Sequence, residues 1–414
     1  GARTALLCTS GFRDSLEIRL GIKERRYDWQ YAPPTPLVPR KLRLPIRERV
    51  DCAGQVHTSL VEEDVHTAIE MFRRESVEAV AVCFLWSFRN ESHERRVGAI
   101  LEAALKDVYI SLSVDILPEI REYDRTSTTV VNAYIGSQVR LYVRRVEELL
   151  GDLGYSGAIR FMQSNAGIAA PDDVERRPVY VLGSGPAAAS AAGLFHASPL
   201  GHQNVLTLDM GGTSCDVCLI QDGIPSVRKG FDFHRYRLGI QAIDIKAVGA
   251  GGGSIAKIDP GGMLRVGPQS AGAEPGPASY GRGGSEPTVT DANLILGYFP
   301  ERELSGGIDL NRDLAVEAIN SKIGESLGLS LEQAAWAIHA VVNNNMARAI
   351  REVSVEQGHD LRDFLLVVGG GCGPIHAAML AAELHMKEVL IPKIASNFCA
   401  FGEVVADLRH SYSR

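Results

Sequence analysis

The sequence predicts an α/β protein built from two domains. Helical and strand patterns alternate twice in its first part. An amphipathic pattern over 64–76 precedes the apolar run Ala79–Phe84, and a second such pair follows at 93–106 and 108–112. Alternation of this kind is typical of a mainly parallel sheet. At 414 residues, the chain is also long enough to bury two hydrophobic cores.

Composition excludes several classes of protein. Hydrophobic residues make up 45% and charged residues 22%, the balance of an ordinary globular protein. The net charge of −7 argues against nucleic-acid binding, which needs basic patches that displace counterions. The apolar runs are far shorter than the roughly 20 residues of a membrane-spanning helix. We therefore expect no nucleic-acid partner and no membrane association.

Cysteine usage points to a reducing compartment. Seven cysteines in so long a chain do not make a disulfide framework, and we expect a cytoplasmic protein. Cys215 and Cys218 form a CxxC spacing inside an alternating, strand-like run. Residues three apart on a strand point to opposite faces, which argues against a zinc or redox role for the pair.

The boundary between the domains is expected near residue 184. A long helical pattern over 126–151 belongs to the first domain, and the run of alanines at 187–192 predicts a closely packed connecting helix. Strand patterns resume at Val205. The expected division is a first domain at 1–184, a connecting segment at 185–203, a second domain at 204–395 and a returning segment at 396–414.

One glycine turn has the chemistry of a phosphate site. An apolar strand from Val205 ends at Asp209, turns through glycines and hydroxyl residues, and continues as the alternating strand 215–220. Such a turn lets a phosphate approach the backbone closely, and the carboxylate can position Mg²⁺ or an attacking group. An ordinary glycine hairpin is the alternative. The predicted phosphate contacts are Gly211, Gly212, Thr213 and Ser214, with Asp209 as catalytic and metal-binding residue.

A second glycine cluster follows the apolar strand at 365–368 and precedes a helical pattern at 375–383. In the actin/hexokinase superfamily, a unit of this kind holds adenosine, and the hairpin, connecting helix and late glycines occur here in the order that this fold requires. The sequence lacks the GxxxxGK[ST] motif of P-loop ATPases. Predicted adenosine contacts are Gly369, Gly370 and Gly371. The bare loop 249–254 is expected to line the same cleft through Gly251 and Gly252.

Several longer stretches are similar to signature motifs of the hydantoinase A/oxoprolinase family, and the resemblance spans 3–410. They are EYDRTSTTVVNAY at 122–134, MQSN at 162–165, GAGGGSIA at 249–256, and SAGAEPGP at 270–277, which runs on through YGRGG at 280–284 to PTVTDAN at 287–293. In this family a first phosphate hairpin normally lies before the equivalent of Arg3, and the subunit continues past the equivalent of His410. The resemblance therefore implies the central part of a longer subunit, without half of its phosphate grip.

The resemblance implies the A-type subunit of an ATP-dependent hydrolase or carboxylase. Such a subunit phosphorylates the carbonyl oxygen of a hydantoin, another cyclic amide, a lactam or a ketone, with ATP and Mg²⁺ (or Mn²⁺) as cofactors. The expected partner is a hydantoinase B-type subunit in a hetero-oligomer. Many members carry a His-Thr pair where Lys246 and Ala247 stand, so no metal site is expected there. The rival interpretation is a non-catalytic nucleotide-binding assembly subunit.

Two further residues are candidates for catalysis, each with an alternative. Asp124 precedes a run of hydroxyl residues at an expected helix start, although its charged neighbours are equally typical of a solvated helix end. Asn165 follows a short strand and is expected to face the cleft, with a turn cap as the alternative. Asp291 is as well explained by helix capping as by acid catalysis.

Overall fold

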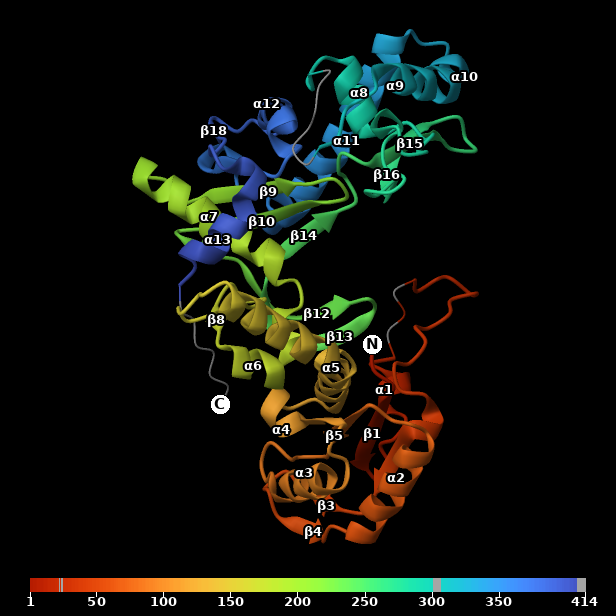
Figure 1. The fold of residues 1–414 in the computed structure, drawn as a ribbon, viewed down its shortest axis with the longest axis vertical. Coiled ribbons are helices and arrows are strands. Elements are labelled where there is room, and N and C mark those ends of the chain that lie inside the picture. Colours follow the sequence, from red (N-terminus) through yellow and green to blue (C-terminus); the bar gives the residue numbers. More distant parts are fainter. Residues whose placement is uncertain (22, 24, 301–306, 408–414) are drawn as a thin grey trace. The chain divides into compact units, whose positions relative to one another are not determined.

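A computed structural model describes residues 1–21, 23, 25–300 and 307–407 of the chain. The described chain forms two compact units. The first contains residues 1–184 and 227–242, and the second contains 185–226 and 243–407. Figure 1 shows the elements of each unit. Part of the expected returning segment, 408–414, lies outside the described residues.

The first unit contains one parallel sheet. Its strand order is β2-β1-β5-β6, and every pairing in it is parallel. This confirms the prediction of an α/β protein with a mainly parallel sheet. The elements of this unit are β1 (Thr4–Thr9), α1 (Ser15–Ile18), β2 (Arg43–Ile46), β3 (Arg49–Val50), β4 (Val56–Thr58), α2 (Glu62–Arg74), β5 (Ala79–Cys83), α3 (Ser92–Ala104), β6 (Tyr109–Leu112), α4 (Ser113–Ile116), α5 (Glu122–Asp152), β7 (Phe161–Met162), β8 (Ile168–Ala169), α6 (Pro171–Arg176), β12 (Val227–Phe233) and β13 (Tyr236–Ile243).

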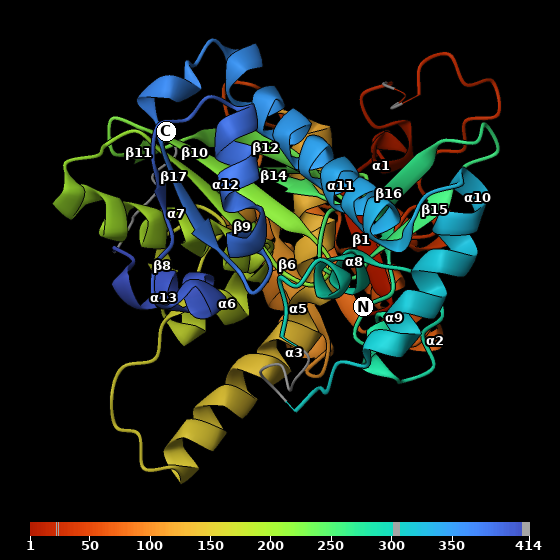
Figure 2. The same cartoon turned by 90° about the horizontal axis from the view of Figure 1, so that it is seen from above.

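Strands β1 and β5 lie at the centre of the first core, because they are the two middle strands of the sheet and all their residues are buried. Helix α2 buries one apolar stripe, Val65, Ile69 and Phe72, at the helical spacing seen in the sequence. The long helix α5 buries most of its first half, while its last turns are exposed and extend away from the sheet (Figure 2). The first half of α5 therefore belongs to the core and the second half does not.

The carboxyl edge of this sheet is closed by a buried polar network. The Glu94 carboxylate is fully buried and accepts from the Phe84 amide at 2.7 Å and from the Ser113 hydroxyl at 2.7 Å. Arg125, also buried, donates to the Ser87 hydroxyl at 2.9 Å. Burial raises the pKa of Glu94, and the Arg125 charge opposes that rise. The protein's own side chains thus fill an edge at which parallel sheets often bind ligands.

The hairpin β12–β13 belongs to the first unit, although residues 227–242 were expected in the second domain. Leu238 and Ile240 are buried there against apolar residues of α4 and α5. The Gly239 amide also donates to the Thr128 hydroxyl of α5 at 2.9 Å. Hydrophobic burial therefore ties this hairpin to α5, a contact that spacing along the chain does not reveal.

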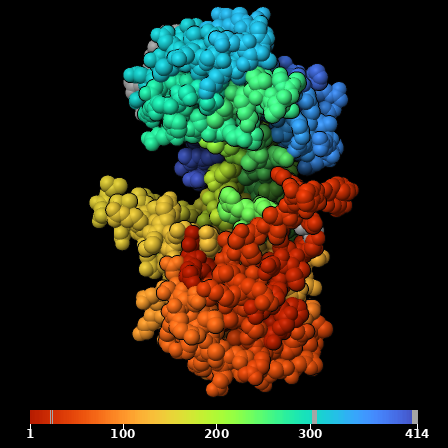
Figure 3. Space-filling model, turned by 90° about the vertical axis from the view of Figure 1, so that its right-hand side faces the viewer, coloured from red at the N-terminus to blue at the C-terminus, as the bar shows by residue number. Residues whose placement is uncertain are grey.

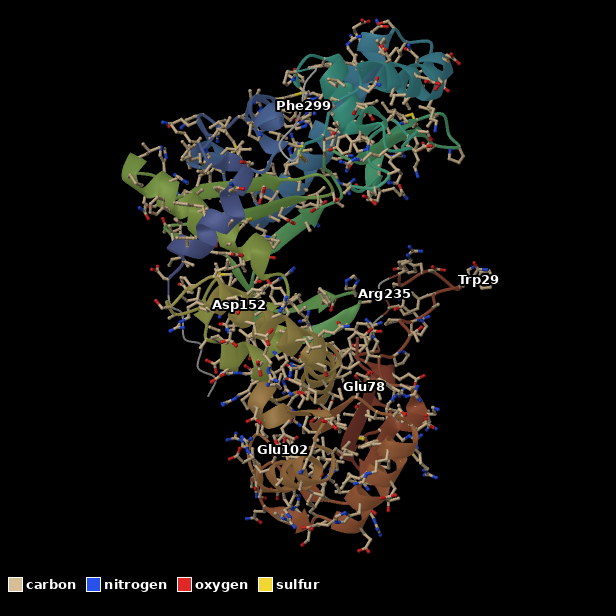
Figure 4. The ribbon with its side chains drawn as sticks, in the orientation of Figure 1. Trp29, Glu78, Glu102, Asp152, Arg235 and Phe299 are labelled. Carbon is tan, nitrogen blue, oxygen red and sulfur yellow. The ribbon has the colours of Figure 1, made fainter. Side chains whose placement is uncertain are left out.

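A loop of residues 25–37 extends beside this hairpin. Arg235 donates to the Ala32 carbonyl at 2.8 Å, and the Tyr236 hydroxyl donates to the Thr35 carbonyl. Figure 4 places Trp29 at the tip of the loop, where its side chain is 88% exposed. The loop stands out in red from the surface in Figure 3.

The second unit is built on a mixed sheet of order β11-β10-β9-β17-β18, with β14 paired to β10. Strand β9 pairs antiparallel with β10 and parallel with β17. The elements of this unit are α7 (Ser184–Ala197), β9 (Val205–Met210), β10 (Cys215–Gln221), β11 (Ile224–Pro225), β14 (Ile245–Val248), β15 (Ser254–Ile258), β16 (Leu264–Ser270), α8 (Val289–Ile295), α9 (Arg312–Ile319), α10 (Glu325–Leu327), α11 (Leu331–Val353), β17 (Leu365–Gly369), α12 (Gly373–Glu383), β18 (Val389–Leu390) and α13 (Phe398–Val405).

Local sequence explains how several of these elements start and stop. The strand β11, which follows the turn at Asp222 and Gly223, is only two residues long, and its Pro225 has no amide to donate. Asp291 is fully buried and accepts from the amide and hydroxyl of Thr288 and from the Ser279 amide. Its carboxylate is therefore occupied in holding the start of α8.

The Lys246 side chain, just before the loop 249–254, forms an ion pair with Glu352 of α11 at 2.6 Å.

Across the described residues, none of the helices combines the length and the apolar character needed to cross a bilayer.

Glu94→Ala is expected to destabilise the first unit by about 3–5 kcal/mol, because it leaves the buried Arg125 charge uncompensated. Urea unfolding followed by circular dichroism measures this loss. Glu102→Ala is the matched control, since Glu102 is exposed on the same helix α3 (Figure 4) and should change stability by less than about 0.5 kcal/mol. Equal effects of the two substitutions would contradict a stabilising role for the network.

Candidate functional site

The turn between β9 and β10 is the predicted phosphate hairpin, and it is an open antiparallel turn. The Gly211 amide donates to the Ser214 carbonyl at 3.1 Å and closes the turn. Gly212 and Thr213 at its tip are exposed. In the described part of the chain, the amides of these two residues make no hydrogen bond. The turn therefore presents backbone donors to whatever binds there.

The loop 249–254 packs directly onto this turn. The Gly252 amide donates to the Gly211 carbonyl at 3.1 Å, and the Gly253 amide donates to the Gly212 carbonyl at 2.6 Å. A Cβ atom added at Gly251 would lie 2.6 Å from the backbone carbon of Thr213. Only glycine permits this approach, so the backbone of one loop fixes the backbone of the other.

The third glycine segment, between β17 and α12, contacts the end of β9 beside this turn. Gly369 is the register partner of Asp209, and the Cys372 amide donates to the Met210 carbonyl at 3.0 Å. Gly370 has a φ of 82°, and an added Cβ there would collide with the Met210 carbonyl. The structure thus brings together the three predicted nucleotide-binding segments, which lie far apart in the sequence.

Open space adjoins these turns. A Cβ atom added at Gly211, Gly212 or Gly371 would have no atom of the described residues within 4 Å apart from its own chain neighbours, and none of these glycines has a positive φ. The fold itself therefore does not require glycine at these positions. A ligand that must approach the backbone closely would require it.

Two carboxylates face each other at the base of the turn. Asp209 on β9 and Asp216 on β10 are direct register partners, so their side chains lie on the same face of the sheet. Burial raises the pKa of both groups, and the charge of Asp209 helps to raise that of Asp216 to about 6. The Asp209 Oδ2 atom also accepts from the Cys399 thiol at 2.8 Å.

Asp216 and Cys399 were not predicted from the sequence. Asp216 carries a usable signal, because it and Asp209 are equally far from the centre of a four-residue turn and must pair across it. Cys399 carries none, since it is 190 residues away from Asp209.

The donor set suits a hard divalent cation. Mg²⁺ prefers oxygen ligands and is usually held by one or two carboxylates together with waters and substrate phosphates. Asp209 and Asp216 supply two such carboxylates. A cation between them would offset the cost of burying their charges, and this burial is the main cause of the raised pKa of each group. Larger groups of His, Cys, Asp and Glu that could hold a metal do not occur among the residues the structure describes.

The other two predicted catalytic residues belong to the first unit. Asp124 lies in the first turn of α5, and its Oδ1 atom is enclosed without a hydrogen-bond partner among the described residues. Asn165 is 8% exposed, and its Oδ1 atom accepts from the Gly167 amide at 2.8 Å in the turn between β7 and β8. This bond is the turn cap that the sequence offered as the alternative. The catalytic roles of both residues remain predictions.

Comparison with known protein families identifies the group of proteins to which this chain is related. Residues 125–412 match the family model described as hydantoinase/oxoprolinase, and residues 1–105 match the model of the N-terminal region of the same family. The chain belongs to the hydantoinase/oxoprolinase family. This confirms the resemblance drawn from the sequence motifs.

Relatives within the family include subunits of different enzymes. The chain is 51% identical over 99% of its length to the caprolactamase subunit alpha of Pseudomonas jessenii, and 36% identical over its whole length to the acetophenone carboxylase gamma subunit of Aromatoleum aromaticum. It covers 59% and 58% of those relatives. The chain therefore spans about three fifths of their length.

Solved structures of relatives share the fold of this chain along nearly its whole length. The crystal structure of the ATP-dependent caprolactamase from Pseudomonas jessenii superposes with a TM-score of 0.86 at 50% identity, covering 99% of this chain and 60% of that one. An acetone carboxylase structure without nucleotide superposes with a TM-score of 0.82 at 28% identity, covering 98% and 59%.

A buried pair of histidines supports the helix that follows the third glycine turn. His376 of α12 stacks on His339 of α11, with ring centroids 4.6 Å apart, and both are fully buried. The Asn343 side-chain amide donates to the His376 Nδ1 atom at 3.0 Å and to the His339 carbonyl at 2.8 Å. Burial, helped by His339, lowers the pKa of His376 to about 3. His376 therefore contributes to the packing of α12 against α11.

Alanine substitutions at two glycines distinguish a position that faces a ligand from a position that packs against protein. Gly212→Ala is expected to leave the melting temperature unchanged and to weaken ADP binding roughly 10-fold, because its methyl group enters only the ligand's space. Gly251→Ala should weaken binding and also destabilise the second unit by about 1–3 kcal/mol, because its methyl group meets backbone. Calorimetry and thermal unfolding measure both effects.

Gly151→Ala on α5 is the control for these two variants. The space around Gly151 is also open, but the residue lies in the first unit, so ADP binding should be unchanged. Normal ADP affinity in Gly212→Ala would argue against a ligand at the tip of the turn.

The histidine pair predicts a pH dependence. Because folding lowers the pKa of His376, the unfolded chain takes up a proton below about pH 6.5 that the folded chain does not. The stability associated with the neutral ring is fully present above that pH and is lost as the pH falls towards 3, by about 1.4 kcal/mol per pH unit.

His376→Gln should therefore flatten the dependence of stability on pH between 6.5 and 5, measured as urea unfolding of the second unit. The slope is the readout, since the substitution also changes packing. His385→Gln, at an exposed position in the same unit, should leave the slope as in the unsubstituted protein. An unchanged slope in His376→Gln would show that His376 is protonated in the folded state.

Proposed function

We propose that this chain provides the nucleotide site of an ATP-dependent enzyme that activates a carbonyl group by phosphorylation. The observation that carries this proposal is the meeting of three glycine turns beside a pair of carboxylates. Each turn contributes backbone rather than side chains, as phosphate recognition requires. We also propose that the two units correspond to the two domains of an actin/hexokinase-type fold.

In the proposed reaction the γ-phosphoryl group of ATP passes to the carbonyl oxygen of the acceptor, and ADP is released. The amides of Gly212 and Thr213 would bind phosphate oxygens as charge shifts between them. Asp209 and Asp216 would hold Mg²⁺, which, when bound, neutralises phosphate charge. Adenosine would lie against the turn formed by Gly369, Gly370 and Gly371.

The acceptor we propose first is a lactam or another cyclic amide. The 51% identity to a caprolactamase subunit alpha favours it over a ketone, for which the identity to an acetophenone carboxylase subunit is 36%. By the same comparison we propose that the chain acts as an A-type subunit in a hetero-oligomer. A B-type partner subunit would then complete the hydrolysis of the activated amide.

The test measures ADP release in the presence and absence of candidate acceptors. It uses the full-length protein together with any subunits that copurify with it. A lactam that accelerates ADP release supports the proposed reaction. Acceleration by a ketone with bicarbonate would favour the carboxylase alternative. ADP binding without stimulation by any acceptor would favour a nucleotide-binding assembly subunit.

Asp209→Asn is expected to lower acceptor-stimulated ADP release by about 100-fold or more, because asparagine keeps the shape of the side chain and loses its charge. Asp222→Asn is the matched control. Asp222 lies in the exposed turn at the far end of β10 with a φ of 50°, which asparagine tolerates well. Turnover at the unsubstituted rate in Asp209→Asn would exclude an essential electrostatic role for this carboxylate.

A further inference from the structure

The contact between Cys399 and Asp209 joins the returning segment to the nucleotide site. The Cys399 Sγ atom lies 2.8 Å from the Asp209 Oδ2 atom and donates to it. Neither the glycine motifs nor the family models assign Cys399 a role. Its neighbourhood contains both carboxylates, since the charges of Asp209 and Asp216 both act on the thiol.

The helix that carries Cys399 is fixed by close packing on both sides of that residue. Phe398 is 1% exposed, and its ring lies so near Gly369 that an added Cβ there would overlap it. Further along α13, Gly402 lies against the Ala188 backbone of α7, again without room for a Cβ. Phe401 packs edge-on against Phe195 of α7, with ring centroids 5.0 Å apart. The thiol is therefore presented to Asp209 by a rigid support.

The two oxygens of Asp209 have different surroundings as a result. Oδ2 accepts from the thiol, and Oδ1 lies beside Gly370, where an added Cβ would meet it. A carboxylate held at one oxygen cannot rotate freely about its terminal torsion, yet it keeps most of its acceptor positions open. Partners of this kind orient ligating carboxylates in metal sites.

We propose that Cys399 is a positioning residue that holds the Asp209 carboxylate in the orientation required for Mg²⁺-dependent nucleotide binding. This inference rests on the proposed function, because it assigns Cys399 a role in the same site. It makes the returning segment part of the nucleotide site, although its sequence contains no motif for phosphate or metal.

The experiment compares the Cys399→Ala and Cys399→Ser variants of the full-length protein. ADP affinity is measured by calorimetry, once with Mg²⁺ and once with EDTA. Cys399→Ala should weaken Mg²⁺-dependent ADP binding by about 10-fold and leave binding in EDTA unchanged. Cys399→Ser keeps a donor and should remain close to the unsubstituted affinity in both conditions. Cys52→Ala, which removes an exposed thiol from the first unit, is the control.

Three results would overturn this inference. Unchanged or tighter Mg²⁺–ADP binding in Cys399→Ala would mean that the thiol does not help Asp209 or competes with the metal. An equal loss with Mg²⁺ and with EDTA in that variant would mean a purely structural role for Cys399. Failure of the unsubstituted protein to bind ADP at all would instead refute the proposed function, and this inference with it.

Discussion

The backbone contact between the β9–β10 turn and the loop 249–254 is the constraint on which the second unit depends. Two amide-to-carbonyl hydrogen bonds join these segments, and Gly251 leaves no room for a side chain between them. The loop engages the carbonyls of Gly211 and Gly212, while the amides of Gly212 and Thr213 make no hydrogen bond among the described residues and can donate to a ligand. The end of β9 at Met210 abuts Gly370, so one small region of backbone sets the positions of strands β9, β10 and β17.

The buried charges of the two units differ in how far neighbouring protein groups compensate them. In the first unit, Glu94 and Arg125 are enclosed and their hydrogen-bonding groups are largely satisfied by neighbours, so the charges close the sheet edge and specify its packing. In the second unit, Asp209 and Asp216 are only partly buried, and each has a pKa raised by its surroundings. A carboxylate pair whose charge is poorly compensated by protein groups favours a bound cation.

Much of this fold could be predicted from the sequence because its signals are local. The buried run of β5, the amphipathic stripe of α2 and the alanines of α7 each define an element over a few residues. The glycine turns were predicted for the same reason. What sequence reasoning missed depends on contacts between distant residues. Packing of β12–β13 against α5 and the approach of Cys399 to Asp209 follow from tertiary burial, which has no periodic signature in the chain.

The chemistry of the second-unit site also explains why one family can serve different acceptors. The groups assembled there are backbone amides, glycine turns and two carboxylates, which in the proposed function would bind phosphate and a cation and carry no information about a lactam or a ketone. Relatives named for caprolactamase, acetophenone carboxylase and acetone carboxylase align with nearly all of this chain. A site made mainly of backbone can be retained while the residues that contact the acceptor change, since backbone geometry depends on the fold and on few side chains. In the proposed reaction, the specificity for the acceptor would therefore reside in groups other than the three glycine turns.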